Sequence, residues 1–499
     1  MTTPGYHVWF RGAVLLAAVV IIGTEKPTHA QTSTGPYTFA MTRSMVERVT
    51  AAWNDELPYV PGEVLVKFRN GTSVATQDRA MSIIRGPIDA TETKWIGNVL
   101  LARTTSEPDP EAAAAALRQQ PEVEWAQPNY VRRLHATPND PSFARQWNFQ
   151  MIGMSRAWDI NPGANANVVV AIIDSGITTQ SASYTFPLWT GNNFENVIVP
   201  FAVTPDIASS RILPGRDFVF WNGPVLDMDG HGTHLAGTVL EETNNNLGLS
   251  GIAYGARLLP LKACYGYWDL QVLQSVFGIP GYVNPNETGG CPDSAVAEAI
   301  RYAADNGARV INLSLGGPFT SAITLEALNY AVSRGVFVAM SVGNNYERGN
   351  ATQYPAAYAP QINGAVSVGA VGASERRAYY SQTGEHLELV APGGDVRDGG
   401  LAGVIYQVGL FDPDFDPFTV IRPRFDRYYE EPLQGTSSAA PHVAGLATLL
   451  YSQGITSPAA IEAAMKRFAK DIGTAGKDNE YGNGLIDARA TLRGLGVAR

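Results

Sequence analysis

From Trp147 onward, short apolar runs alternate with longer segments of helical spacing, and this alternation limits the possible fold more than any other feature of the chain. The apolar runs have the length and the β-branched content of buried strands, and they lie at residues 168–173, 257–261, 310–313, 336–341 and 365–368. Helix-length patterns lie at residues 293–305, 321–334, 437–451 and 458–468. Strands that alternate with helices pair in parallel and are covered by those helices. We therefore predict an α/β domain with a mainly parallel sheet flanked by helices.

In such a sheet, ligands bind beyond the carboxyl ends of the strands. Polar residues that directly follow an apolar run are therefore the first candidates for a functional site. Asp174 follows the first run and Asn344 follows the run at 336–341.

A second, smaller domain is predicted before this one. Strand patterns at 63–68, 99–102 and 123–126 enclose helix patterns at 73–84 and 111–120. The order fits a β-α-β-β-α-β unit over residues 58–130, a ferredoxin-like α+β fold, although one of its four strands has no separate pattern. The polar stretch VRRLHATPNDP, residues 131–141, is typical of a linker, and we place the domain boundary between residues 136 and 137.

The N-terminus is predicted to be an export signal over residues 1–30. Arg11 precedes a twelve-residue apolar run at 12–23, and Thr28-His29-Ala30 has the small residue that a cleavage site requires. The alternative is a buried helix. No later run approaches about 18 apolar residues, so we expect no membrane association after removal of the signal.

The two cysteines, Cys264 and Cys291, are expected to form a disulfide if the protein is exported, the alternative being two buried thiols. The charge balance is 36 Lys+Arg against 46 Asp+Glu, and 36 − 46 gives −10. A negative net charge opposes binding to nucleic acid and to anionic membranes, so neither is an expected partner.

Four segments contain the residues that could carry chemistry. They are VVVAIIDSG with Asp174, DGHGTHLAGT with His231 and His234, VAMSVGNN with Asn344, and GTSSAAPHVAG with Ser437, Ser438 and His442. Acyl transfer by a serine needs a hydroxyl, an imidazole to take its proton, a carboxylate to orient the imidazole, and donors for the oxyanion. Taken singly, each residue also has a structural interpretation: the Asp as a turn residue, the His as a buried structural residue, Ser437 as a helix N-cap. The combination, in the order Asp, His, Ser, is one of three known chain orders for a catalytic triad.

In these four segments and in the terminal YGNGLIDA, the chain resembles the subtilisin-like serine endopeptidases over residues 137 to about 490. The resemblance implies a catalytic domain over residues 137–499. It also implies that Asp174 orients His231, that His231 is the general base and Ser437 the nucleophile, and that Asn344 and the Ser437 N–H bind the oxyanion. No cofactor is required for this chemistry. His234 and His442 are expected to be packing residues.

The resemblance has two departures. Ser438 follows the nucleophile where the family usually has Met, which adds a second hydroxyl. The stretch from Thr178 to Pro214 lacks the family's His-Pro-Asp-Leu-like segment, in which an Asp helps to hold calcium. Other calcium elements are present, with Asp140 and Asn245 as candidate oxygen ligands of a structural calcium ion. The alternative is that the Asn run is an ordinary turn.

The substrate cleft is also implied by resemblance. Ser314, Leu315 and Gly316 match the edge segment that pairs with extended polypeptide substrates. Gln353 matches a position at the first specificity pocket, which we expect to be uncharged and roomy. The alternative is a polar loop residue.

These inferences predict a secreted serine endopeptidase, extracellular or periplasmic, that cleaves peptide bonds through an acyl-enzyme and acts as a monomer. Residues 31–136 are predicted to be a propeptide that inhibits the enzyme and is removed by self-processing between Val131 and Asn139. A permanent interaction domain is the alternative for this segment. For the whole chain, the alternative is a catalytically inactive subtilase-like binding or scaffold protein. Other hydrolases are excluded, because the chain has no G-x-S-x-G, and His231 and His234 lack the H-E-x-x-H pattern.

Overall fold

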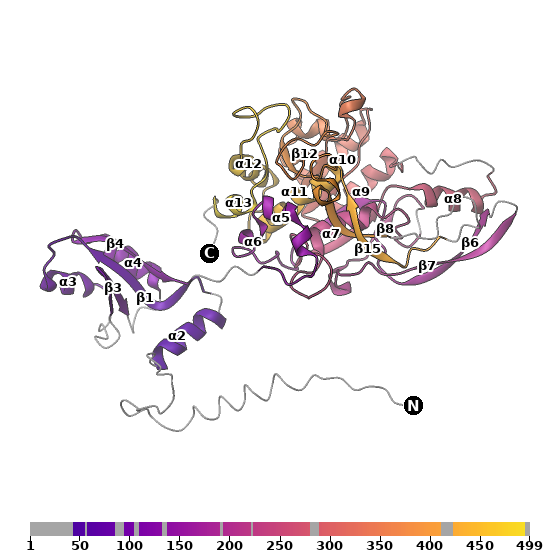
Figure 1. Cartoon of the computed structure of the whole chain (residues 1–499). Coiled ribbons are helices and arrows are strands. Elements are labelled where there is room, and N and C mark those ends of the chain that lie inside the picture. The colour runs from indigo at the N-terminus through magenta and orange to yellow at the C-terminus, as the bar shows by residue number, and fades with distance from the viewer. Residues whose placement is uncertain are drawn as a thin grey trace, which may run out of the picture. The chain divides into compact units, whose positions relative to one another are not determined.

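The structure of the protein is a computed structural model (Figure 1), and it describes residues 43–54, 57–84, 94–103, 109–131, 137–189, 193–220, 223–279, 289–410 and 423–494. The predicted export signal and residues 132–136 of the predicted linker lie outside these residues. The chain divides into two compact units, Met1–Arg132 and Arg133–Arg499.

The N-terminal unit is a four-stranded antiparallel sheet with the strand order β2-β3-β1-β4. Its elements in chain order are α2 (Arg43–Asn54), β1 (Tyr59–Phe68), α3 (Val74–Met81), β2 (Lys94–Ile96), β3 (Val99–Arg103), α4 (Pro110–Arg118) and β4 (Val123–Tyr130). From β1 to β4 this is the predicted β-α-β-β-α-β order, and the strand without a sequence pattern is β2. All three residues of β2 are exposed, so the strand has no apolar alternation to detect.

The C-terminal unit contains a seven-stranded parallel sheet of order β13-β12-β11-β10-β5-β9-β8. The strands are β5 (Val169–Asp174), β8 (Arg216–Asp217), β9 (Arg257–Lys262), β10 (Val310–Leu313), β11 (Phe337–Ser341), β12 (Ala365–Val371) and β13 (Leu389–Pro392). The helices are α5 (Trp147–Met151), α6 (Met154–Ala157), α7 (His231–Leu240), α8 (Tyr267–Val276), α9 (Asp293–Asp305), α10 (Ala322–Ser333), α11 (Thr436–Ser452), α12 (Pro458–Phe468) and α13 (Ala488–Gly494), with short 3₁₀ turns at Phe143–Arg145, Ser209–Arg211, Tyr346–Arg348, Ala356–Gln361 and Gly400–Gly403. The predicted α/β fold with a mainly parallel sheet is confirmed.

Burial explains why this sheet forms. Every residue of β5, β10, β11 and β12 is buried, which is the pattern of strands covered on both faces. Helix α11 packs along the sheet and contacts five of its strands, from β5 to β13. Nearly all of its side chains are buried, so it is the central helix of the unit.

Two antiparallel hairpins of this unit were not predicted, nor were the strands β8 and β13 or the helices α5, α6, α7, α8 and α13. The hairpins are β6 (Ala182–Trp189) with β7 (Phe194–Phe201), and β14 (Ile405–Leu410) with β15 (Tyr428–Leu433). Helix α8 lies within the loop that the Cys264–Cys291 disulfide closes, and this disulfide was predicted. A closed loop of this size stabilises a folded protein by about 3–4 kcal/mol in the chain-entropy description.

The sheet brings the carboxyl ends of four neighbouring strands, β11, β10, β5 and β9, to one edge. Asn344 comes shortly after β11, Ser314 directly follows β10, Asp174 ends β5 and Lys262 ends β9. Residues far apart in the chain therefore meet because parallel strands end on the same side. Among the described residues, no helix has the length and apolar character needed to cross a membrane.

Candidate active site

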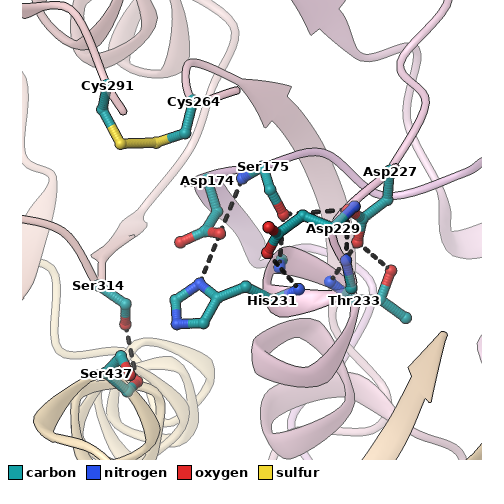
Figure 2. Close-up of polar contacts among 12 residues, drawn as sticks. Asp174, Ser175, Asp227, Asp229, His231, Thr233, Cys264, Cys291, Ser314 and Ser437 are labelled. Atoms are coloured by element: carbon teal, nitrogen blue, oxygen red, sulfur yellow. Dashed lines mark hydrogen bonds and ion pairs between the residues drawn. A yellow bond between two sulfur atoms is a disulfide. The ribbon is translucent and has the colours of Figure 1, made fainter. Parts of the chain in front are cut away.

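The centre of the site is a hydrogen bond between Asp174 and His231. Asp174 ends the buried strand β5, and His231 is the first residue of α7. His231 Nδ1 lies 2.7 Å from Asp174 Oδ1 (Figure 2). A carboxylate only accepts, so Nδ1 carries the proton and donates it. The neutral imidazole therefore has its lone pair on Nε2, on the other side of the ring.

Ser175 and Asp227 hold this pair in place. The Ser175 N–H donates to Asp174 Oδ1 at 2.7 Å, and the Ser175 hydroxyl accepts from the N–H of Gly232 in α7. Asp227 Oδ1 accepts from the same hydroxyl and from two N–H groups before α7, while Oδ2 accepts from both the N–H and the hydroxyl of Thr233. These contacts fasten the end of β5 to the beginning of α7 (Figure 2).

The electrostatic environment of His231 favours its charged form. Burial lowers the pKa of the imidazole, but the charge and hydrogen bond of Asp174 and the charges of Asp229 and Asp227 outweigh it and raise the pKa to about 9. The side chain keeps 30% of its surface exposed to solvent. Asp229 lies two residues before His231, and its Oδ1 accepts from the His231 N–H at 3.3 Å.

Ser437 lies in the first turn of α11, directly after Gly435 and Thr436. The Asn344 Oδ1 accepts from the N–H and the hydroxyl of Thr436, at 2.8 and 2.9 Å. Because both partners are donors, the oxygen faces Thr436 and the Nδ2 amide faces away from it. A Cβ atom at Gly435 would lie 2.8 Å from Ser437 Oγ and 3.3 Å from Asn344 Nδ2. Glycine therefore keeps open the space that the hydroxyl and the amide share.

Pro441 leaves the Ser437 carbonyl free to bind the residue that follows β10. Proline has no N–H, so in α11 it leaves the Ser437 carbonyl without its usual partner four residues on. The Ser314 hydroxyl donates to this carbonyl at 2.8 Å (Figure 2). The segment after β10 is thus attached directly to the residue that carries the candidate nucleophile.

All four predicted chemical residues and all four predicted substrate residues line one cleft of about 1300 Å³. Ser314, Leu315 and Gly316 form one wall, and Gly316 is exposed. Gly317 and Tyr354 exchange two backbone hydrogen bonds of 2.8 and 2.9 Å, which places Gln353 beside that wall. Gln353 is buried, and its amide donates to the Ala351 carbonyl.

The other hydroxyl and imidazole groups of the motifs are buried. Ser438 is 1% exposed, in contrast to the half-buried Ser437. Burial lowers the pKa of His234 to about 3 and that of His442 to about 4, so both imidazoles are neutral at pH 7. His442 donates from Nδ1 to the Ser438 carbonyl and accepts from the Asn148 amide at 2.8 Å.

The candidate calcium residues lie next to each other. Their hydrogen bonds do not include Asp174 or His231. Asp140 accepts from the N–H groups of Asn244 and Asn245, both at 3.1 Å. The Asn245 amide donates to Asp206 Oδ1 at 2.5 Å. Asp206 lies in the stretch from Thr178 to Pro214, where the sequence showed no calcium segment, so sequence reasoning missed it. In the part of the chain that the structure describes, no group of three or more His, Cys, Asp and Glu is arranged to hold a metal.

The fold and the cleft define a class: an α/β enzyme whose site lies at the carboxyl edge of a parallel sheet, with an Asp–His pair and a serine at a helix N-terminus. The subtilase family model matches residues 165–484, and the fervidolysin N-terminal prodomain model matches residues 47–129. The chain belongs to the subtilase family and is a subtilisin-like serine endopeptidase that carries an N-terminal prodomain.

Relatives support this conclusion. A thermophilic serine proteinase of Bacillus sp. (strain AK1) is 31% identical, over 85% of this chain and 86% of the relative. Thermitase of Thermoactinomyces vulgaris is 31% identical, over 70% of this chain and 98% of the relative. A solved protease structure from Pseudoalteromonas arctica is 27% identical, with a TM-score of 0.53, and the match covers 72% of this chain and 99% of that one.

The carboxylates around His231 lead to a prediction about its titration. In the Ser437→Ala protein, which excludes autolysis, the imidazole should lose its charge with a midpoint near pH 9. Asp229→Asn should move the midpoint to lower pH, because it removes a negative charge while Asn still accepts from the His231 N–H. The measurement is NMR titration of the histidine ring nitrogens, in which His234 and His442 should stay neutral from pH 6 to 10.

The control is Glu326→Gln, which removes an exposed carboxylate on α10 that does not line the cleft. It should leave the midpoint unchanged. A midpoint near 6.5 in the Ser437→Ala protein, or no change in that midpoint when Asp229→Asn is added, would show that the surrounding carboxylates do not control His231.

Proposed function

We propose that the protein hydrolyses peptide bonds through an acyl-enzyme, with Asp174, His231 and Ser437 as its catalytic triad. The observation that carries this proposal is the 2.7 Å bond from His231 Nδ1 to Asp174 in a cleft that Ser437 also lines. Once the imidazole is neutral, the bond fixes the tautomer with a free Nε2, which is the atom that a general base needs.

In this mechanism His231 Nε2 takes the proton of the Ser437 hydroxyl as Oγ attacks the substrate carbonyl carbon. Among the described residues, His231 and Ser437 are not hydrogen-bonded to each other. Catalytic hydrogen bonds of this kind often tighten only when substrate is present. The Asn344 amide and the Ser437 N–H stabilise the oxyanion, helped by the positive end of α11. The C–N bond breaks, and imidazolium gives its proton to the leaving amine. Water, activated in the same way, then hydrolyses the ester.

The substrates are extended polypeptides, paired through main-chain hydrogen bonds with Ser314, Leu315 and Gly316. This wall supports the proposal because it lies in the cleft and is attached to Ser437 through Ser314. Gln353 makes the first specificity pocket uncharged. Every side chain of the proposed site comes from one unit of one chain, so we propose that a monomer is active.

The assignment of the nucleophile can be tested by substitution. Ser437→Ala should abolish labelling by a fluorophosphonate and lower kcat by about 10⁶, the magnitude known for subtilisin. Ser438→Ala is the matched control, and it should keep labelling and kcat within about threefold, since Ser438 is buried away from the cleft. Measurements of labelling and peptide hydrolysis on both proteins decide the point. Activity that survives in Ser437→Ala would refute the triad, and a labelled but inactive enzyme would favour the alternative of a binding protein.

We further propose that the protein is made as a self-processing zymogen, with residues 1–30 as export signal, 31–136 as propeptide and 137–499 as catalytic domain. The prodomain match and the separate ferredoxin-like unit support this order. The propeptide would inhibit the cleft until it is removed. The disulfide supports export to an extracellular or periplasmic location, where such bonds persist.

Self-processing predicts different fates for two proteins during export. Wild type should lose all residues up to a cut between Val131 and Asn139, whereas Ser437→Ala should accumulate with that segment intact. N-terminal sequencing by mass spectrometry of both exported proteins measures this. Cutting of both proteins at the same place, or of neither, would show that the N-terminal unit is not a self-removed propeptide.

We also propose a structural calcium ion held by Asp140, Asp206 and Asn245. The residues fit this role in one specific respect: Asp206 Oδ2 is buried and has no hydrogen-bond partner. Burial and the charges of Asp140 and Glu242 raise the pKa of Asp206 to about 6, although the hydrogen bond from Asn245 lowers it. A bound cation would give Oδ2 a partner and would offset the burial of the Asp206 charge. Hard oxygen ligands of this kind suit calcium, which would stabilise the fold without taking part in the chemistry.

Calcium should therefore raise the melting temperature of the Ser437→Ala protein. At 100 times the dissociation constant the gain is about 2.7 kcal/mol, or roughly 3–4 °C in Tm for a unit of this size. Asp206→Asn should abolish most of this shift, and Glu326→Gln should keep it. The shift should also shrink below pH 6, because Asp206 takes up a proton there. Calorimetry in calcium and in EDTA measures it, and equal Tm values for the Ser437→Ala protein in the two buffers would rule the ion out.

A further inference from the structure

Lys262 is a lysine completely removed from solvent beside the proposed triad. It ends strand β9 and pairs in register with Asp174 at the end of β5. Its exposed fraction is 0%, and it is one of the largest fully buried side chains of the described residues. The proposed chemistry gives it no role.

The Lys262 ammonium has two hydrogen-bond partners, and the buried Asp217 carboxylate and the Phe220 ring also lie near it. It donates to the Ser175 carbonyl, and it forms an ion pair with the carboxylate of Asp269 at 3.2 Å. Asp269 comes from α8, inside the disulfide-closed loop, and is also 0% exposed. Its Oδ2 accepts from the Gly266 N–H at 2.8 Å.

Stability alone does not account for this pair. Removing an ammonium and a carboxylate from water costs several kcal/mol per ion, and apolar replacements of buried pairs are often neutral or stabilising. The cost shows in Asp269, whose pKa burial raises to about 6 although Lys262 opposes the shift. A costly pair next to a reacting centre is therefore better explained by what it positions.

The group that Lys262 holds is the main chain at Ser175. The N–H of Ser175 donates to Asp174 Oδ1, the same oxygen that binds His231. Directly after Ser175 the chain turns sharply at Gly176, where φ is +117° and a Cβ would lie 2.6 Å from the Leu226 carbonyl oxygen. A displacement of the main chain at Ser175 would move the donor that orients the Asp174 carboxylate. The Lys262 ammonium opposes that displacement from the carbonyl side.

We propose that Lys262 is a positioning residue for peptide hydrolysis: its buried ammonium holds the Ser175 carbonyl and thereby keeps the Asp174 carboxylate aimed at His231. The proposal rests on the triad of the proposed function. Asp269 has a different part, which is to supply the charge that makes burial of the lysine tolerable.

This division of roles can be tested with Lys262→Met, Asp269→Asn and the double variant, assayed in purified enzyme below the lowest Tm. Asp269→Asn should lower Tm but keep kcat within threefold, because even an uncharged lysine amine donates to the carbonyl. Lys262→Met should lower both Tm and kcat. The double variant should have a clearly higher Tm than Lys262→Met, since the unpaired Asp269 charge is gone and only Asp217 still lacks its cationic neighbour, while its kcat stays about 10–100-fold low with KM within threefold. A misplacement of up to about 1 Å in catalytic geometry produces losses of this size.

The double variant is decisive because it separates stability from activity. If it regains both Tm and kcat, Lys262 serves only the fold and the proposal is wrong. A raised KM with wild-type kcat would assign Lys262 to the cleft wall and also contradict the proposal, as would failure of both lysine variants to fold. Ser437→Ala, assayed in parallel, keeps the two proposals apart: activity in that protein refutes the triad, whereas its inactivity together with wild-type kcat in the double variant refutes only the role of Lys262.

Discussion

The arrangement of the site depends on one short connection, the hydrogen bond from His231 to Asp174 across the junction of β5 and α7. Two residues 57 positions apart meet within 2.7 Å. Such a bond forms reliably only if both backbones are fixed before the side chains meet. Ser175 and Asp227 fix them, by hydrogen bonds to the first turn of α7 and to each other. The parallel sheet supplies the rigid edge from which β5 delivers Asp174.

A second constraint is charge. Three carboxylates, Asp174, Asp227 and Asp229, surround an imidazole that burial alone would keep neutral, and together they raise its pKa to about 9. Carboxylates that lie close together repel one another. Hydrogen bonds from backbone N–H groups to Asp174 and Asp227 reduce this repulsion. No carboxylate raises the pKa of His234 or His442, and burial lowers the pKa of each imidazole. The same residue type thus has two behaviours in one domain, according to its neighbours.

The regular part of the fold was predictable, and the insertions were not. Helices α9 and α12 have the bounds that their periodicity indicated, because each places an apolar stripe against the core. Strand β2 escaped detection because all its residues are exposed. The hairpin β6–β7 and helix α8 pack largely on each other rather than on the parallel sheet, so no pattern set by the main core predicts them. In the site, the sequence order and glycine contexts predicted Asp174, His231, Asn344 and Ser437, all of which line one cleft.

By itself, the sequence determined the fold class, the prodomain and the residue types of the chemistry, because these depend on local periodicity and on motifs a few residues long. Only the tertiary structure decided which distant groups meet. Asp206 reaches Asn245 39 positions away, Lys262 reaches Ser175 87 positions away, and Ser314 reaches the Ser437 carbonyl 123 positions away. None of these contacts has a sequence pattern, since each is produced by the way strands, helices and loops pack together, and a chain encodes that packing only through its whole core.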